Sequence, residues 1–331
     1  MIGFFYLKGL LIFLIINIIF LPSGYSNSKN YNPVASIVNL EGIVKIQTKE
    51  SQKFKYARDG MLLFNGNKII TSINSKTGIL YRDGSKVRIF QNSELILNFS
   101  EENFNKKRSF KYLLTFKKGS LRGRFMKDLQ NTNIRTPSAI IGIKGTTFRV
   151  SEKNNDSTVS LTEGKLEVKN LSSSITIETG QWLNGFGPNT NLAKKVSFLP
   201  NILALKTNFY EIDFKEGDSK QIELSIQIQN RISEKIIKRS GSLALESDYK
   251  KINLPRKILL DERGFAKILI QIDPPSLNEP KFFGLIKIRA FVDDEGFDEV
   301  AEGLLVLKIK NYRKKRTILI HPDRGIFEKK Y

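Results

Sequence analysis

The pattern that most constrains this chain is the alternation of apolar and polar residues between Val34 and Phe186, interrupted at short intervals by glycine. Successive side chains of a β-strand point to opposite faces, so a period of two is typical of strands with one buried face. Residues 78–90 alternate on both sides of Asp83-Gly84, which is a strong hairpin signal. A helical period is not evident in this segment. We therefore predict an all-β domain over 34–187, built from many short strands joined by glycine turns.

A second series of alternating segments follows a connector. Residues 188–209 show no clear period, and we expect a linker with one helical turn between Leu192 and Phe209. Apolar residues then alternate without fault over 222–228, and further strand-like segments follow at spacings suited to a sandwich. The sequence thus predicts an immunoglobulin-like β-sandwich over 210–311. The remaining residues, 312–331, are predicted to form an exposed basic tail.

The first residues decide the expected compartment. An apolar stretch runs from Gly9 to Leu21, Pro22 ends it, and small residues occupy positions 24 and 26. This order is typical of a secretory signal peptide, and the stretch is shorter than the roughly 20 apolar residues of a spanning helix. We expect cleavage after Ser26, so that 1–26 is the signal peptide; the alternative is an uncleaved anchor. The predicted location is the periplasm, the cell envelope or the extracellular space.

Charge and cysteine content narrow the function classes. Lys and Arg number 54 and Asp and Glu 33, so the formal net charge is +21. Such a field attracts anions, although a composition inherited from an AT-rich genome explains it equally well. Because the chain is expected to be exported, nucleic acid is a poor candidate partner. The remaining candidates are an envelope protein and an anionic envelope polymer. The absence of cysteine excludes disulfides, thiol nucleophiles, thiolate metal sites and a lipidated cysteine after the leader.

One glycine-containing stretch, IRTPSAIIGIKGTTFRV, raises a question of side-chain direction. Ile141 and Ile143 share one parity with Ala139, whereas Phe148 and Val150 share the other, so an uninterrupted strand would point them to opposite faces. A glycine bend at Gly145 adds one residue and resets the parity. We therefore predict a kinked pair of core strands.

The flanking residues of this stretch suit the same interpretation. Pro137 lacks an amide donor and fits the start or the edge of a strand, while Thr146 and Thr147 have hydroxyls that can tie the bend to nearby backbone. A phosphate cradle would require a helix to begin after the glycines, and the residues that follow are typical of a strand. The glycines are therefore expected to shape the backbone and to hold no cofactor.

These motifs resemble the FecR domain family, whose hallmark is a Thr-Pro, a Gly-Thr-x-Phe and a Glu-Gly hairpin in that order. The upstream segments NGNKIITS and YRDGSKVRIFQNSEL also resemble that family, and the resemblance covers roughly 34–187. It implies a β domain of the roll or solenoid-like type. The motif residues are Thr136, Pro137, Gly142, Gly145, Thr146, Phe148, Glu163 and Gly164.

FecR-type signalling proteins place this domain in the periplasm and connect it to a sigma factor through a membrane span and a cytoplasmic segment. We expect no cytoplasmic segment ahead of the apolar stretch, and the second half is expected to be immunoglobulin-like instead of receptor-contacting. The resemblance therefore implies the fold and a role in extracytoplasmic protein contact. It does not imply direct control of a sigma factor.

Few residues suggest chemistry. The sole histidine, His321, is expected to be an exposed tail residue, and no nucleophile, metal quartet or cofactor fingerprint is recognisable. The acidic group within 293–299 is expected to be a solvated hairpin turn, with calcium binding as the alternative. Arg135, Lys144 and Arg149 flank the kinked strand pair and are the residues we expect to face a partner.

Three function classes follow from this reading. The first is a secreted or periplasmic, non-enzymatic binding or scaffolding protein that needs no cofactor. The second is an envelope signal-transduction regulator that acts through a membrane partner. The third, a wall-polymer hydrolase, has the least support because no catalytic motif is present.

Overall fold

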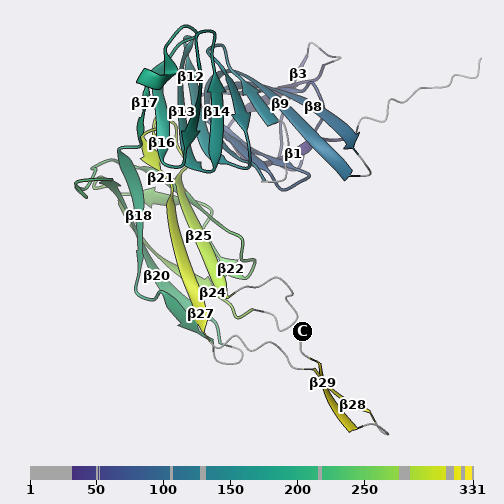
Figure 1. Cartoon of the computed structure of the whole chain (residues 1–331), viewed down its shortest axis with the longest axis vertical. Helices are drawn as coiled ribbons and strands as arrows, with labels where there is room; N and C mark the ends of the chain where they lie inside the picture. The colour runs from purple at the N-terminus through teal and green to yellow at the C-terminus, as the bar shows by residue number, and fades with distance from the viewer. Residues whose placement is uncertain are drawn as a thin grey trace, which may run out of the picture. The chain divides into compact units, whose positions relative to one another are not determined.

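The computed structural model describes residues 32–49, 51, 53–104, 107–126, 132–214, 218–275, 284–310, 317–321 and 325–329. Most of these residues lie in strands, and the one helical element among them is the 3-10 turn η1 (Leu192–Lys194), so the all-β prediction is confirmed (Figure 1). Within the described ranges, no helix combines the length and the apolar character needed to cross a membrane. The expected signal peptide, 1–26, and the basic run Arg313 to Arg316 lie outside them.

The first half of the chain forms one hydrogen-bonded system of seventeen strands. These are β1 (Ala35–Glu41), β2 (Val44–Gln47), β3 (Phe54–Tyr56), β4 (Leu62–Leu63), β5 (Lys68–Thr71), β6 (Lys76–Tyr81), β7 (Lys86–Ile89), β8 (Glu94–Phe104), β9 (Lys107–Arg124), β10 (Thr132–Arg135), β11 (Ile140–Ile143), β12 (Thr147–Lys153), β13 (Asp156–Glu163), β14 (Lys165–Lys169), β15 (Ser174–Glu178), β16 (Gln181–Phe186) and β17 (Val196–Phe198).

The seventeen strands divide into two layers that share β9. One layer runs β4-β1-β6-β7-β9-β12-β13-β16-β17 and the other runs β3-β2-β5-β8-β9-β10-β11-β14-β15. The chain therefore passes repeatedly from layer to layer, as in a roll. Strand β9 passes between layers at Gly119, which adopts φ +103°. A Cβ there would lie 2.5 Å from Ser93 Cα, so the crossing requires glycine.

A single apolar core lies between these layers. Ile141 and Ile143 of β11 and Phe148 and Val150 of β12 all belong to it, each at most 2% exposed. Strands β11 and β12 lie in different layers, and Gly145 between them adopts φ +62°. The change of layer at this glycine is what lets residues of opposite parity face the same core.

The second half forms two five-stranded sheets with a core of their own. Their orders are β22-β24-β20-β18-β26 and β19-β27-β25-β21-β23. The strands are β18 (Asn201–Thr207), β19 (Glu211–Asp213), β20 (Lys220–Asn230), β21 (Gly241–Ser247), β22 (Ile252–Asn253), β23 (Ile258–Leu260), β24 (Phe265–Ile272), β25 (Leu285–Val292), β26 (Val300–Ala301) and β27 (Gly303–Lys310). This arrangement is a β-sandwich.

Two segments carry more strand than the sequence suggested. Strand β18 lies within 188–209, where we expected a connector. The sequence did not reveal this strand because its alternation is short and few of its residues are exposed. Residues of the expected basic tail form a hairpin of β28 (Thr317–His321) and β29 (Gly325–Lys329), and His321 ends β28.

Candidate functional site

Two of the family-like motifs meet in space. Gly164 adopts φ +99°, and a Cβ on it would lie 2.7 Å from Thr146 Cγ2 and 2.8 Å from the carbonyl oxygen of Gly145. Glu163 pairs with Thr147 across β12 and β13, next to a register shift. The Glu-Gly hairpin therefore packs directly against the bend between β11 and β12, which explains the glycine at its second position.

The Thr-Pro motif forms a tight turn and a buried polar network. The amide of Thr136 donates to the carbonyl of Ala139 at 2.8 Å, and the Thr136 hydroxyl accepts from the amides of Ser138 at 3.2 Å and Ala139 at 3.0 Å, so a side chain closes the turn around Pro137. Pro137 thus lies in the turn before β11 and not at the start of a strand. The hydroxyls of Ser138 and Ser157 donate to the carboxylate of Glu152, which is 2% exposed. The motif secures a turn and shows no accessible reactive group.

The remaining motif residues also serve packing. Phe148 lies against Gly123, where a Cβ would come within 2.5 Å of its ring, and it stacks on Phe125 with centroids 6.1 Å apart. The hydroxyl of Thr146 is buried without a hydrogen-bond partner, so the expectation that it ties the bend is wrong. Gly142 is not sterically required, since a Cβ there would meet Asn133 at an ordinary 3.5 Å.

A row of three arginines crosses the outer face of the layer that contains β7, β9 and β12. Arg88 is the cross-strand partner of Arg122, and Arg122 is the partner of Arg149. Arg122 is 3% exposed and Arg149 is 8% exposed. Because like charges directly opposite one another destabilise a sheet, this arginine row needs compensation from outside its own layer.

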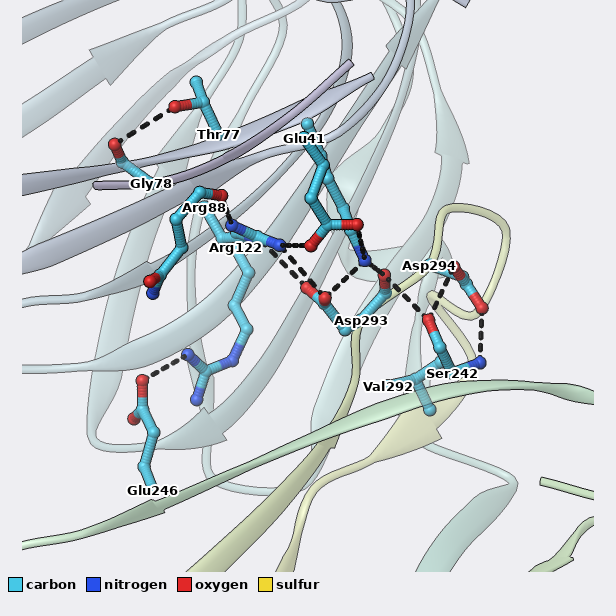
Figure 2. Close-up of polar contacts among 12 residues, drawn as sticks. Glu41, Thr77, Gly78, Arg88, Arg122, Ser242, Glu246, Val292, Asp293 and Asp294 are labelled. Carbon is cyan, nitrogen blue, oxygen red and sulfur yellow. Dashed lines mark hydrogen bonds and ion pairs between the residues drawn. The ribbon is translucent and has the colours of Figure 1, made fainter. Parts of the chain in front are cut away.

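The sandwich supplies that compensation at its acidic segment. Asp293, which follows β25 and is 4% exposed, accepts hydrogen bonds from Arg88 Nε at 2.9 Å and Arg88 Nη2 at 3.1 Å. Lys76 Nζ donates to the Asp293 carbonyl at 3.0 Å and to its carboxylate. Glu41 of β1 completes the cluster at 3.1 Å from Arg88, and Figure 2 shows Glu41, Arg88 and Asp293 converging.

The central arginine is held by a two-pronged ion pair. Arg122 Nε donates to Glu302 Oε1, and its Nη2 donates to Oε2 at 2.8 Å. Glu246 lies 3.8 Å from the same guanidinium, which also covers the Phe291 ring at 3.7 Å from the centroid. A bidentate contact of this kind fixes orientation as well as charge. It joins β9 to the sandwich.

The third arginine uses carbonyl acceptors in place of a carboxylate. Arg149 Nη1 donates to the carbonyl of Asp294 at 2.6 Å, Nη2 donates to the carbonyl of Val292, and the guanidinium lies 4.8 Å from the Phe90 ring centroid. The motif residue Glu163 also reaches the sandwich, at 3.5 Å from Arg289. The described residues from Pro33 onward accordingly belong to one compact unit.

Burial and charge act in opposite directions on these groups. Burial raises the pKa of the Asp293 carboxyl, but Arg88 and Lys76 outweigh burial and hold that pKa below its usual value. The pKa of Glu246 is lowered in the same way, with Arg122 as the strongest neighbour. Burial disfavours the charged form of Arg122, yet Glu302 and Glu246 raise its pKa above the usual value. For Arg149 burial dominates and lowers the pKa.

The three residues that the sequence predicted to face a partner differ in burial. Arg135 and Lys144 are exposed, whereas Arg149 is buried against the sandwich and faces no external partner. The acidic segment 293–299 is not a solvated turn, because Asp293 is buried in ion pairs and Asp298 accepts from Ser151 at 2.8 Å. Among the described residues, no three acidic or histidine side chains are grouped as a metal would require.

Sequence reasoning missed Arg88, Arg122 and Glu302. A signal existed, since Arg88, Arg122 and Arg149 each lie next to a core residue in an alternating strand and therefore had to face outward. Their adjacency was hidden, because β7, β9 and β12 are far apart in sequence.

The family model described as FecR protein matches residues 67–167, which contain the arginine row. No curated protein matches the sequence significantly. Two crystal structures of a protein described as a candidate anti-sigma factor from Parabacteroides distasonis ATCC 8503 are similar at 18% and 19% identity, with TM-scores of 0.30 and 0.31. Each match covers 39% of this chain and 57% of that chain, so this chain spans little more than half of their length.

Proposed function

We propose that this chain, in which residues 67–167 form a FecR domain, is an extracytoplasmic, non-enzymatic protein of envelope signal transduction that acts by contacting a partner protein. The family match carries this proposal. The geometry supports it, because the motif residues serve turns, glycine crossings and packing, and none of them presents a nucleophile or an acid–base pair to an open cavity.

The ion pairs between the FecR domain and the sandwich also support a role in signal transduction. Arg122 and Glu302 join the FecR domain to the sandwich through a bidentate contact in which Arg122 is buried. Halves joined by specific buried ion pairs resist independent motion more than halves joined by a linker. A partner that binds one half would therefore also affect the other.

We assign the partner surface to the exposed residues Arg135 and Lys144 on and after β10 and β11. We also propose that residues 1–26 are removed on export, and that the boundary between the two halves lies between β17, which ends at Phe198, and β18, which begins at Asn201. Mass spectrometry of the mature N-terminus tests the first of these assignments, and a surviving Met1 would contradict it.

The function is tested by deleting the gene in the native organism and measuring the transcriptome. We expect a discrete set of transcripts to change, and to be restored by the full chain but not by a chain lacking 1–26. A photo-crosslinking amino acid at Arg135 or Lys144 should capture one envelope protein, whereas the same probe at Leu269, which is 68% exposed on β24, should not. An unchanged transcriptome contradicts the signalling role.

A second candidate is a scaffold that binds an anionic envelope polymer, which the net charge of +21 favours. Its weakness is that Arg88, Arg122 and Lys76 are already paired within the chain. Co-sedimentation with purified envelope polymer at low and high salt separates the two candidates. Strong, salt-sensitive co-sedimentation together with an unchanged transcriptome would favour the scaffold.

A further inference from the structure

A surface that the proposed function does not use lies where β17 meets the turn after β20. Phe198 at the end of β17 is 63% exposed, and Ile232 in the turn is 92% exposed. Exposed basic residues lie close to them in sequence: Lys194 and Lys195 precede β17, and Arg231 and Lys235 belong to the turn that carries Ile232. We call these six residues the Phe198–Ile232 patch.

Arg231 holds the two parts of the patch together. Its amide donates to the carbonyl of Pro200 at 2.7 Å, and its Nη1 donates to the carbonyl of Gly180 at 3.1 Å. Its guanidinium lies 5.7 Å from the Phe198 ring centroid. Ile232, the next residue, is therefore placed close to β17 by direct contacts.

The turn that carries Ile232 is well ordered by its own hydrogen bonds. The side-chain oxygen of Asn230 accepts from the amides of Ile232 at 3.1 Å and Ser233 at 2.9 Å, which forms an Asx-type turn. A turn of this kind normally carries polar residues at its tip. An aliphatic side chain that is 92% exposed at such a turn buries little apolar area within the chain itself.

The charge of the patch selects the kind of partner. Among the described residues, Lys194, Lys195 and Lys235 form no ion pair, and Glu234 is the acid within the turn. Apolar tips flanked by cations are the composition of interfacial membrane contacts.

We propose that the Phe198–Ile232 patch docks the protein on an anionic lipid bilayer, with Ile232 and Phe198 inserted among the headgroups. A fluid surface suits this shape, because two separately projecting side chains enter it without needing a matching groove. The lysines attract the anionic lipid, while the apolar residues add contact that salt does not screen. This proposal is independent of the proposed signalling function.

The test is flotation of the full mature chain with vesicles of phosphatidylglycerol and phosphatidylcholine in equal parts, and with phosphatidylcholine alone. We expect binding to the anionic vesicles, part of which persists at high salt. The double variant Ile232→Ser with Phe198→Ser should lower the partition coefficient by at least about tenfold, as expected for losing two inserted side chains. The matched control is Leu259→Ser with Leu269→Ser, two leucines 70% and 68% exposed elsewhere on the sandwich, and it should bind as the parent does.

Several outcomes would overturn the proposal. No loss in either double variant would mean that vesicle binding reflects the net charge alone, and equal loss in both would mean that exposed apolar side chains contribute wherever they lie, so that the patch has no special role. Absence of vesicle binding by the parent chain would also refute it. A change from dimer to monomer on Ile232→Ser, seen by analytical ultracentrifugation without vesicles, would assign the patch to self-association instead. Thermal melts confirm that the variants fold.

Discussion

Strands β7, β9 and β12 present two faces that differ in chemistry although they share the same backbone. On one face Ile89, Leu121 and Val150 are cross-strand neighbours, each fully buried in the core. One residue away on each strand, Arg88, Arg122 and Arg149 form the arginine row on the other face. Both faces are covered, one by side chains of its own domain and the other by the sandwich.

The difference shows how each kind of contact distinguishes partners. Apolar residues accept any neighbour of suitable shape, so the inner face tolerates changes that conserve volume. A buried charge accepts only a geometrically matched counter-charge, because leaving it unpaired is costly. The inner face therefore supplies most of the stability. The charges of the outer face restrict which surface can pack against the outer face.

The largest effect is expected from breaking the central pair on one side only. Arg122→Met leaves Glu302 buried without its partner, and we expect a loss of about 3–5 kcal/mol in unfolding free energy. The double variant Arg122→Met with Glu302→Leu should recover most of that loss, since an apolar pair needs no counter-charge. Urea unfolding followed by fluorescence of Trp182, the chain's sole tryptophan, measures both. A double variant no more stable than the single would contradict this account.

A slightly smaller effect is expected one residue away, on the inner face. Leu121 is 0% exposed, and Leu121→Ala should cost about 3 kcal/mol through lost contacts and a cavity. Adding Glu302→Leu should not rescue it, because the two residues serve opposite faces and their effects should add. Rescue of Leu121→Ala by this change would mean that the faces are coupled.

An intermediate loss of stability is expected when a glycine with positive φ is replaced by alanine, and a glycine in open space serves as the control for one in close contact. Gly84 has φ +86° with open space around its Cβ position, so Gly84→Ala should cost about 1–2 kcal/mol from the left-handed backbone alone. Gly164→Ala adds collisions with Thr146 and Gly145 and should cost clearly more. Thermal melting compares the two, and equal costs would argue against the tight meeting of the motifs.

The smallest effect near neutrality is expected from pH. Asp293 and Glu246 have pKa values below normal in the folded chain, so they contribute stability that is complete above the unfolded pKa of about 4. That stability is lost as the pH falls through the lower folded values. Stability should therefore be flat from pH 7 to about 5 with respect to these groups, and the difference between the parent and Asp293→Asn should narrow below about pH 4. A constant difference at every pH would contradict the assignment.

Much of the inner architecture could be predicted from the sequence, and little of the interface could. Alternation and glycine turns are local signals, so the all-β class and the common core of Ile141 and Phe148 followed from spacing alone. The arginine row depends on which strands become neighbours, and the same alternation permits many strand orders. The acidic segment was interpreted as solvated because its partners, Arg88 and Lys76, lie more than half the chain away in sequence.

The arginine row also restricts how this chain can be cut or recombined. A fragment that ended after β17 would keep its apolar interior yet turn Arg88, Arg122 and Arg149 toward water as a basic stripe. Such a fragment would collect polyanions from a lysate, and nucleic acid found with it would be an artefact of excision. Exchange of the sandwich for an unrelated module would fail for the same reason, so the two halves are expected to be inherited together.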